Sequence, residues 1–372
     1  MFKSFKDLLK PSMTAFVEID GSYLEGGGQA LRNALSLSVL LKRPVRVVKI
    51  RANRPKPGLS HQHLHGVNLL RDIAKADVTG NKLLSTELEF TPHKITSAMY
   101  KMDTRTAASI TLIYQMIMPV LLFGGSPSRV DVIGGTNVSF SPQVEYMQQV
   151  LQPTLKRLGV NFDLKVLHYG FYPRGSGRCL LDIEPLRMLK AVELTDFGKF
   201  KTVQGLTYYA GRLPKCIAFD IQHSAEREMH RLWPGHECNI QVHKHMPDKA
   251  RDNGAGLILV AETSTGITLG AAGLGEKNID GHFIGSNVSC ELAGYIKHEI
   301  CVDAHMQDQL IIYMALAQGC SRILTGPLTK HTRTAIYVAE QMADVKFNIE
   351  YDDSGHTLIS CEGIGYCNEY LA

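Results

Sequence analysis

The sequence predicts an α+β protein, in which three repeated αβαββ-type units form a large domain and a smaller α/β domain is inserted. Its 372 residues are enough for two domains or for one repeated domain. One order of elements recurs three times: a helix, a short strand, a polar loop, a second helix and two strands. Extra residues separate the second and third occurrences. We expect a tail over 1–15, a large domain over 16–188 and 299–366, and an inserted domain over 189–298.

The first unit begins with an apolar-periodic segment over 29–42. Its apolar side chains share one face at helical spacing, which predicts a helix. A strand is expected at Val45–Ala52 and a polar loop at Asn53–Leu59. A second helix is expected to follow Ser60, since serine commonly caps helix N-termini.

The second unit has the same order. Its expected elements are a helix over 106–123, a strand at Arg129–Ile133, a loop at Gly134–Ser141 and a helix at Pro142–Leu158. The most apolar stretch of the chain, Ile110–Phe123, is too short to span a bilayer and predicts a buried core helix.

The third unit closes the chain. Its expected elements are a helix over 306–318, a strand at Arg322–Thr325, a loop at Gly326–Thr329, a helix at Lys330–Ala343, and strands at Val345–Tyr351 and Thr357–Glu362. If the three units pack around an axis, their polar loops converge on one site.

The insert contains the single tryptophan, Trp233, and a glycine-rich stretch at Asn253–Gly256 before an expected strand at Leu257–Ala261. These glycines fit a turn that leads into the strand. A second phosphate-binding loop is the less frequent alternative.

Composition excludes several classes of protein. With 44% hydrophobic and 20% charged residues the sequence is globular, and a net charge of +4 is too small for a protein that coats nucleic acid. All eight cysteines lie at or after Cys179 and none forms a C-x-x-C pair, so neither a zinc framework nor a disulfide scaffold is indicated. Residues 1–15 carry charges and no long apolar core, which argues against a secretory signal.

A glycine loop opens the first helix, in the stretch Glu25–Arg32 (EGGGQALR). Consecutive glycines let backbone N–H groups approach an anion, and the helix start favours negative charge. Glu25 can hold a hard cation and Arg32 a phosphate, with a flexible turn as the alternative. No acid occurs between Glu25 and Asp72, so the basic residues of that stretch favour a phosphate-bearing ligand. They are Lys42, Arg43, Arg46, Lys49, Arg51, Arg54 and Lys56.

Arg51 and Arg54 lie in a proline-stiffened loop, which suits fixed phosphate contacts; a solvated basic surface is the alternative. The histidines His61 and His65 are one helical turn apart, but no carboxylate stands where a zinc-protease motif needs it. Gln62 and His63 fit phosphate contacts better, or an exposed helix start.

The chemistry of three polar residues leaves more than one role for each of them. Gln115 is the only strongly polar side chain of the apolar helix, so it either caps a backbone group or faces a ligand. At the start of the last helix, His331 can attack phosphorus through its neutral ring, and Lys330 is the rival nucleophile. A structural role is the third alternative for this histidine.

Together these motifs resemble those of RNA 3′-terminal phosphate cyclases, particularly the animal enzymes, over essentially the whole chain after about residue 16. The resemblance is carried by Glu25–Arg32, Ile50–Ala52, Pro57–Leu59, Gln62–Leu64, Gly134–Asn137, Gly170–Gly175, Asp308–Leu310 and His331–Ala335.

The resemblance implies a reaction that uses ATP and a divalent cation, Mg²⁺ or Mn²⁺. Such enzymes transfer AMP to their own histidine, release pyrophosphate, and pass the AMP to an RNA 3′-phosphate. The neighbouring 2′-hydroxyl then displaces AMP and leaves a 2′,3′-cyclic phosphate. The implied partner is RNA with a 3′-terminal phosphate and not a membrane. The implied location is the nucleoplasm, with a cytoplasmic fraction as an addition. The inserted domain is expected to have a thioredoxin-like arrangement.

The resemblance also implies roles for single residues. His331 matches the nucleophile, and Glu25 matches the carboxylate that holds the metal near the ATP α-phosphate. The residues that match the triphosphate and RNA-phosphate region are Arg32, Arg51, Arg54, Gln62 and His63. Those that match the adenosine and nucleophile pocket are Gln115, Pro142, Asp308 and Gln309. His305 stands where the family commonly has a tyrosine that stacks on adenine, so a smaller ring is expected to stack there.

Two other functions fit parts of the pattern. A catalytically inactive relative of the same fold acts in ribosome assembly, but such relatives lack the nucleophilic histidine. An enolpyruvate transferase on a similar repeated architecture would need different phosphate and carboxylate contacts.

Overall fold

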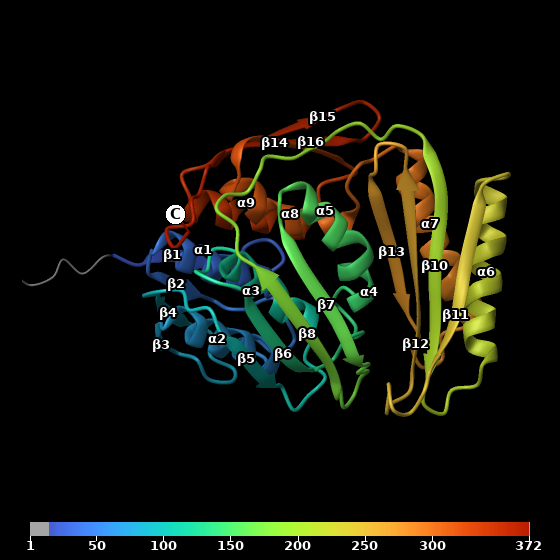
Figure 1. Cartoon of the computed structure of the whole chain (residues 1–372), viewed down its shortest axis with the longest axis horizontal. Coiled ribbons are helices and arrows are strands. Elements are labelled where there is room, and N and C mark those ends of the chain that lie inside the picture. Colours follow the sequence, from blue (N-terminus) through green and yellow to red (C-terminus); the bar gives the residue numbers. More distant parts are fainter. Residues whose placement is uncertain (1–14, 372) are drawn as a thin grey trace, which may run out of the picture.

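The computed structural model describes residues 15–371. These residues form four four-stranded sheets with helices packed against them, so the expectation of an α+β fold is confirmed (Figure 1). The predicted tail, residues 1–15, lies outside the described residues except for Ala15. Among the described helices, none has both the length and the apolar character needed to cross a membrane.

Three of the sheets share one pairing scheme. In each, the first strand runs parallel to the second, and the fourth strand runs antiparallel to both the second and the third. The first sheet contains β1 (Val17–Asp20), β2 (Val45–Val48), β3 (Asp77–Thr79) and β4 (Leu88–Thr91). The second contains β5 (Met99–Asp103), β6 (Ser128–Gly134), β7 (Asn161–His168) and β8 (Gly177–Glu184). The third contains β9 (Glu193–Leu194), β14 (Gln318–Thr325), β15 (Phe347–Tyr351) and β16 (Thr357–Ile364).

Helices lead into and follow the second strand of each sheet, at the places that apolar periodicity predicts. In the first unit these are α1 (Gln29–Leu41) and α2 (His61–Ala74). In the second they are α3 (Ile110–Leu121) and a continuous run of α4 (Val144–Tyr146), the π-helical η1 (Met147–Leu151) and α5 (Gln152–Arg157). In the third they are α8 (Ala304–Leu316) and α9 (Lys330–Met342).

Several expected boundaries differ from the structure for local reasons. The strand predicted at Val45–Ala52 ends at Val48, because Lys49 and Arg51 take left-handed backbone conformations with φ of 50° and 53°. The helix predicted from 106 begins at Ile110, after a capping serine. The predicted pattern also lacked the first strand of each sheet, which in β9 is only two residues long.

The fourth sheet has the strand order β11-β10-β12-β13 and lies within the predicted insert. Its strands are β10 (Phe200–Ala210), β11 (Glu237–His245), β12 (Gly254–Thr263) and β13 (Thr268–Leu274), and its helices are α6 (Cys216–Leu232) and α7 (Gly281–Lys297). Figure 1 shows this sheet at the right, with the two helices along its outer side. In sequence it falls between β9 and α8, and β9 itself pairs with β14.

The glycine-rich stretch of the insert is not a loop. Gly254 and Gly256 lie within β12, so both the expected turn before Leu257 and the alternative of a second phosphate-binding loop are wrong. A side chain at Gly254 would collide with the ring of Phe171, which means that the glycine allows the insert to pack against the second unit.

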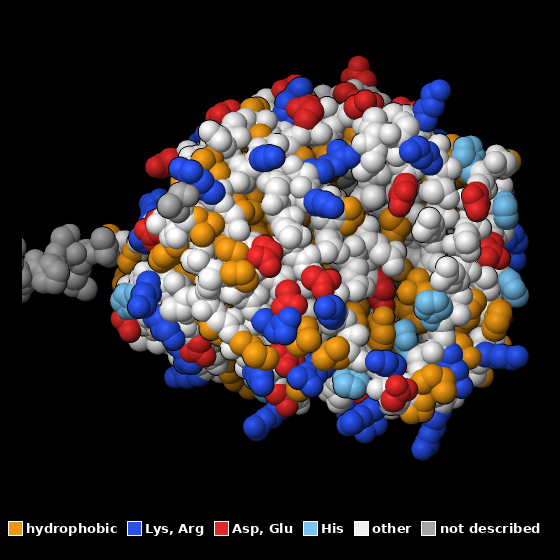
Figure 2. Space-filling model, viewed as in Figure 1, with side chains coloured by type: hydrophobic (Ala, Val, Ile, Leu, Met, Phe, Trp, Pro, Cys, Tyr) orange, Lys and Arg blue, Asp and Glu red, His pale blue; other side chains and the backbone are white. Residues whose placement is uncertain are grey.

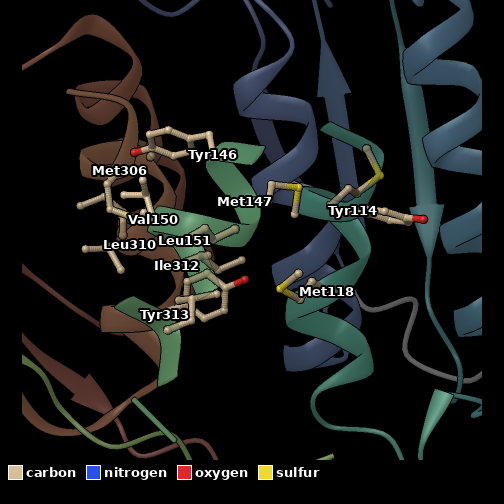
Figure 3. Packing of buried hydrophobic residues seen from close by; sticks show 14 of the residues in the cluster. Tyr114, Met118, Tyr146, Met147, Val150, Leu151, Met306, Leu310, Ile312 and Tyr313 are labelled. Carbon is tan, nitrogen blue, oxygen red and sulfur yellow. The ribbon is translucent and has the colours of Figure 1, made fainter. Parts of the chain in front are cut away.

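The core is centred on the apolar helix α3, whose residues Ile110–Leu121 are nearly all buried, as predicted. Figure 3 shows the α4–η1 segment, with Tyr146 and Met147, lying between α8, with Met306, and α3, with Met118. This packing brings the helices of the second and third units together beside the site described next. Each of the eight cysteines is a free thiol.

Candidate active site

A cavity of about 600 Å³ opens where the first three turns of several helices meet. It is lined by Gln29 and Arg32 of α1, Leu112 and Gln115 of α3, Ala304, His305, Asp308 and Gln309 of α8, and His331 of α9. The 139–143 loop, Arg54, Tyr146 and Thr329 complete the lining, together with Ala272, Leu274 and Glu276 of the insert. Helix N-termini present unpaired N–H groups and a positive dipole end, so a site surrounded by four of them favours a polyanion.

His331 of the third unit and Glu25 of the first unit form an ion pair. Nδ1 of His331 lies 2.9 Å from Oε2 of Glu25. The start of α9 is fixed by Thr329, whose hydroxyl accepts a hydrogen bond from Thr332 N at 3.0 Å, and whose N–H donates to Gln307 at 2.9 Å. Because Nδ1 faces Glu25, Nε2 is the ring nitrogen left for chemistry.

Glu25 is held between two cations. Its Oε1 accepts a hydrogen bond from Arg54, while Oε2 is buried and, apart from the ion pair with His331, has no hydrogen-bond partner among residues 15–371. Burial would raise the pKa of Glu25, but His331, Arg54 and Arg32 prevail and lower it. The interaction with Glu25 in turn raises the pKa of His331, against the opposing effect of burial.

Arg32 is buried at the back of the cavity. Its Nε donates a hydrogen bond to Oε1 of Gln115 at 3.0 Å, and Nη2 donates to Gln29. Burial lowers the pKa of Arg32 to about 10, so it remains positive at neutral pH. Gln115 therefore bonds to a side chain and not to the backbone group that was one predicted alternative, and it lines the cavity, as the other alternative requires.

Asp308 is buried on the cavity side of α8, with a relative exposure of 9%. Burial raises the pKa of this carboxyl to about 6, and His331, Arg32 and His305 act in the opposite direction. Next to it, Gln309 donates to the carbonyl of His305 at 2.7 Å and so stiffens the first turn of α8.

His305 and Pro142 lie on the open side of the cavity. The ring of His305 is half-exposed, with a side-chain exposure of 52%, and it meets Tyr146 edge-on at a centroid distance of 6.0 Å. Pro142 belongs to the 139–143 loop, where Phe140 is almost fully exposed and has a φ of 63°. A flat apolar group such as a nucleobase can enter between these side chains.

The buried carboxylate of Asp303 connects the first turn of α8, on the open side of the cavity, to the insert. Asp303 caps α8, and its Oδ1 accepts from His305 N, Met306 N and the hydroxyl of Tyr146, the last at 2.6 Å. Its Oδ2 accepts from Gly270 N in β13 at 2.9 Å. Asp303 is fully buried.

Four predicted site residues, Glu25, Arg51, Gln62 and His63, lie outside the cavity lining. The phosphate contacts of the last three stay predictions. Arg51 donates to the carbonyls of Lys56 and Gly58, which fixes its own loop. Gln62 accepts from Ser109 N at 3.3 Å.

The last of them, His63, is buried, and its Nδ1 lies 2.6 Å from the hydroxyl of Ser60. Ser60 therefore stands at the N-cap position without making the predicted cap bond. Burial, together with Arg32, Arg51 and Arg54, lowers the pKa of His63 to about 3, so the ring is neutral. A side chain at Gly28 would collide with this ring, which gives the glycine loop a packing role.

The basic stretch between positions 42 and 56 is less available to an anion than its sequence indicates. Lys42 pairs with Glu369, Lys49 with Asp20, and Arg46 with Glu87. Acids from neighbouring strands and from the end of the chain thus neutralise part of it. No cluster of three or more His, Cys, Asp or Glu side chains that could hold a metal occurs in the described part of the chain.

The sequence pattern did not single out Gln29, Phe140 or Tyr146, although all three line the cavity. Gln29 follows the three glycines directly, so its position at a helix start was a usable signal. Tyr146 lies in a helix whose apolar pattern indicates core, and nothing in the sequence separates its hydroxyl from those of other tyrosines.

Comparisons with known proteins identify the family of the chain. A sequence model of the RNA 3′-terminal phosphate cyclase family matches residues 23–349. The chain is 61% identical to an RNA 3′-terminal phosphate cyclase of Drosophila melanogaster, over 95% of this chain and 98% of that protein. It is 37% identical to proteins of the same name from Pyrobaculum aerophilum, over 94% and 99% of the two chains, and from Methanopyrus kandleri, over 90% and 95%.

Proposed function

The chain belongs to the RNA 3′-terminal phosphate cyclase family and is an ATP-dependent RNA 3′-phosphate cyclase, and we propose that its reaction passes through AMP carried on His331. The contact of Nδ1 with Glu25 is the observation that supports this proposal, because it leaves Nε2 as the attacking atom beside a cavity suited to a nucleotide. The predicted alternative, a binding protein for ribosome assembly, would have no use for this pair.

In the first step, Nε2 of neutral His331 attacks the α-phosphorus of ATP, and pyrophosphate leaves. Arg32 and Arg54, with the surrounding helix N-termini, hold the triphosphate and stabilise its growing charge. Adenine enters between Pro142 and the ring of His305. Since Glu25 stabilises the charged imidazole, it also stabilises the positive charge that develops on the ring during attack.

In the second step, an oxygen of the RNA 3′-phosphate attacks the phosphorus of the histidine adenylate, and His331 leaves. The 3′-phosphate, joined to AMP, now has a good leaving group. In the third step the adjacent 2′-hydroxyl attacks the RNA phosphorus, AMP departs, and a 2′,3′-cyclic phosphate remains. Each transfer exchanges one P–O or P–N bond for another.

A divalent cation, Mg²⁺ or Mn²⁺, fits beside Glu25. Beyond its contact with Nδ1 of His331, the buried Oε2 has no hydrogen-bond partner among the described residues, so a further lone pair is left for an ion, and oxygen is the ligand type that these ions prefer. The protein offers one carboxylate rather than a full cage, which is typical of Mg²⁺ sites that take further ligands from phosphates and water. When bound, the ion would draw charge from the ATP phosphates.

We infer that the three sheets with a common pairing scheme are repeats, and that the part of the predicted 189–298 insert that follows β9, from β10 to α7, is an inserted domain of thioredoxin-like arrangement. The shared strand order supports the first inference. The helix α6 that connects the parallel strands β10 and β11 supports the second. Location in the nucleoplasm remains a prediction, and imaging of the tagged full chain tests it.

The proposed reaction is tested with ATP labelled at the α-phosphate and three RNAs that differ only at the end. A 3′-phosphate should give labelled protein, labelled RNA and then a cyclic end, and a 3′-hydroxyl should give labelled protein only. A 2′-deoxy-3′-phosphate should accept AMP and never cyclise, since it has no attacking hydroxyl. A cyclic product from the deoxy RNA would contradict the proposed sequence of steps.

A further inference from the structure

A second cavity, of about 740 Å³, lies outside the proposed ATP site where three loops meet. The β5–α3 connection contributes Arg105, the β7–β8 connection contributes Arg174, and the β11–β12 connection of the insert contributes Lys249 and Arg251. Figure 1 shows these strand ends together at the lower edge of the molecule, and Figure 2 shows Lys and Arg side chains gathered along the same edge.

Positive charge prevails in this cavity. Arg178 is paired with Asp131 and Arg174 with Asp252. In contrast, the exposed side chains of Arg105, Lys249 and Arg251 form no ion pair with any residue between 15 and 371. Within the same described range, Asp103 is the single acid that lines the cavity.

Asp103 does little to neutralise the three unpaired cations. Its Oδ1 accepts a hydrogen bond from the backbone N–H of Arg105 at 2.8 Å, so this carboxylate is engaged in shaping the loop. The cavity is therefore suited to a ligand with several negative charges.

The loops that carry the cations are fixed to one another. Tyr169 N donates to the carbonyl of Lys249 at 2.6 Å, and Tyr169 forms an isolated bridge with Ala250. Its ring also stacks on His245 at a centroid distance of 3.8 Å. These contacts hold Lys249 and its neighbours against the second unit.

An exposed aromatic residue adjoins the cavity lining in sequence. Tyr172 is 78% exposed and directly precedes Pro173, which lines the cavity. Unpaired cations with an exposed aromatic ring are the usual means of holding single-stranded RNA, since the cations bind phosphates and the ring stacks on a base.

The two cavities lie on either side of the start of α3. Thr106 lines the basic cavity and Leu112 lines the ATP cavity, and the chain between them spans at most about 20 Å. At roughly 3.4 Å per stacked nucleotide, this length corresponds to about six nucleotides. An RNA whose 3′-phosphate lies at His331 must also cross the ATP cavity, so its upstream backbone reaches the basic cavity only when the RNA is longer than these six nucleotides.

We propose that this basic cavity binds the sugar–phosphate backbone of the substrate RNA upstream of its 3′-phosphate. The inference rests on the proposed function, because it takes its ligand from the reaction at His331. It assigns to the insert, through Lys249 and Arg251, a part in substrate binding.

The experiment compares two RNAs that end in the same 3′-phosphate, one of two nucleotides and one of twelve. The variant replaces three cations together, Arg105→Ala, Lys249→Ala and Arg251→Ala. For the long RNA we expect KM to rise roughly tenfold and the slope of log KM against log salt to fall by about 2, because three phosphate contacts are lost. For the short RNA, KM and kcat should be unchanged.

A matched control replaces three other exposed lysines that line neither cavity, Lys156, Lys199 and Lys297, by alanine. It should leave the length dependence of KM unchanged. An identical length dependence in the cavity variant and the parent overturns the inference. Absence of protein–AMP in the parent overturns the proposed function instead, and the two failures are thus distinguishable.

Discussion

Nδ1 of His331 and Oε2 of Glu25 lie 2.9 Å apart, so the first and the last unit of the chain together build the nucleophile and its charged partner. The glycine loop at the start of α1 and the capped start of α9 are far apart in sequence. Only the packing of α1 against α9 and of α9 against α8 brings them together.

The nucleophile is tested by His331→Ala and Lys330→Ala. The first variant should form no protein–AMP and no cyclic product, while remaining folded, because the side chain of His331 is half-exposed. The second should retain labelling with α-labelled ATP. Mass mapping of the labelled peptide checks the assignment, and AMP on Lys330 would refute it.

Glu25→Gln tests the electrostatic pairing. The interaction with Glu25 is the main cause that raises the pKa of His331, so loss of the charge leaves only Asp308 to oppose burial and Arg32 and should lower that pKa. An NMR titration of the ring protons, without metal or ATP, measures the shift. Because attack requires the neutral ring, the acidic limb of the adenylation rate should also move to lower pH, although the maximal rate should fall by orders of magnitude.

The control for this titration is Glu291→Gln. Glu291 lies 3.7 Å from His305 rather than beside His331, so its loss should leave the pKa of His331 as in the parent. The same pKa of His331 in parent and Glu25→Gln would show that the pair does not set the protonation of the nucleophile.

Asp308→Asn should change how stability depends on pH. Burial raises the pKa of Asp308 from its ordinary value of 3.8 to about 6, so ionisation favours the unfolded chain. The parent therefore loses stability as pH rises from about 4 to about 6, and the asparagine variant does not. Relative to the parent, the variant should gain up to roughly 3 kcal/mol over this range and nothing more above it.

Urea unfolding of both proteins at pH 4 to 8 measures this difference. Asp344→Asn is the control, since Asp344 is exposed. A difference in the free energy of unfolding between Asp308→Asn and the parent that does not vary with pH would contradict the prediction.

His305→Ala and His305→Tyr test the contact with adenine. The alanine variant should weaken ATP binding by roughly 1 kcal/mol, the scale of one ring contact, and the tyrosine variant should keep or tighten it. Thermal stability should change little, because the His305 side chain is 52% exposed. If KM for ATP is unchanged in both variants while the alanine variant melts at a lower temperature, the ring serves packing instead.

The sequence predicted the helices well, because their apolar residues recur at helical spacing over three or more turns. Short strands were missed for the opposite reason: β9 has two residues, too few for an alternating pattern. The strand at Val45 was predicted too long because Lys49 and Arg51 adopt positive φ. A positive φ at a residue other than glycine is uncommon and cannot be predicted from the residue type.

The sequence allowed us to choose the residues with suitable chemistry for the site. It did not allow us to predict which of these residues lie close to one another in the folded chain. The basic stretch indicated free positive charge, yet Lys42 is paired with Glu369 from the other end of the chain. Likewise, no spacing rule indicates that Glu25 meets His331. The role of Tyr146 follows from a hydroxyl contact with Asp303, which exists only in the folded chain.

The carboxylate of Asp303 connects the insert directly to the first turn of α8, which lines the proposed ATP cavity. One buried group thus contacts both β13 and the first turn of the helix that carries His305. A shortened chain without the insert would lose the Gly270 donor and expose Oδ2 of Asp303 to water, at a cost of roughly 1.5–3 kcal/mol, the net contribution of a hydrogen bond to a charged group. The insert is therefore not a detachable module, since its removal would weaken the capped helix on which ATP is expected to rest.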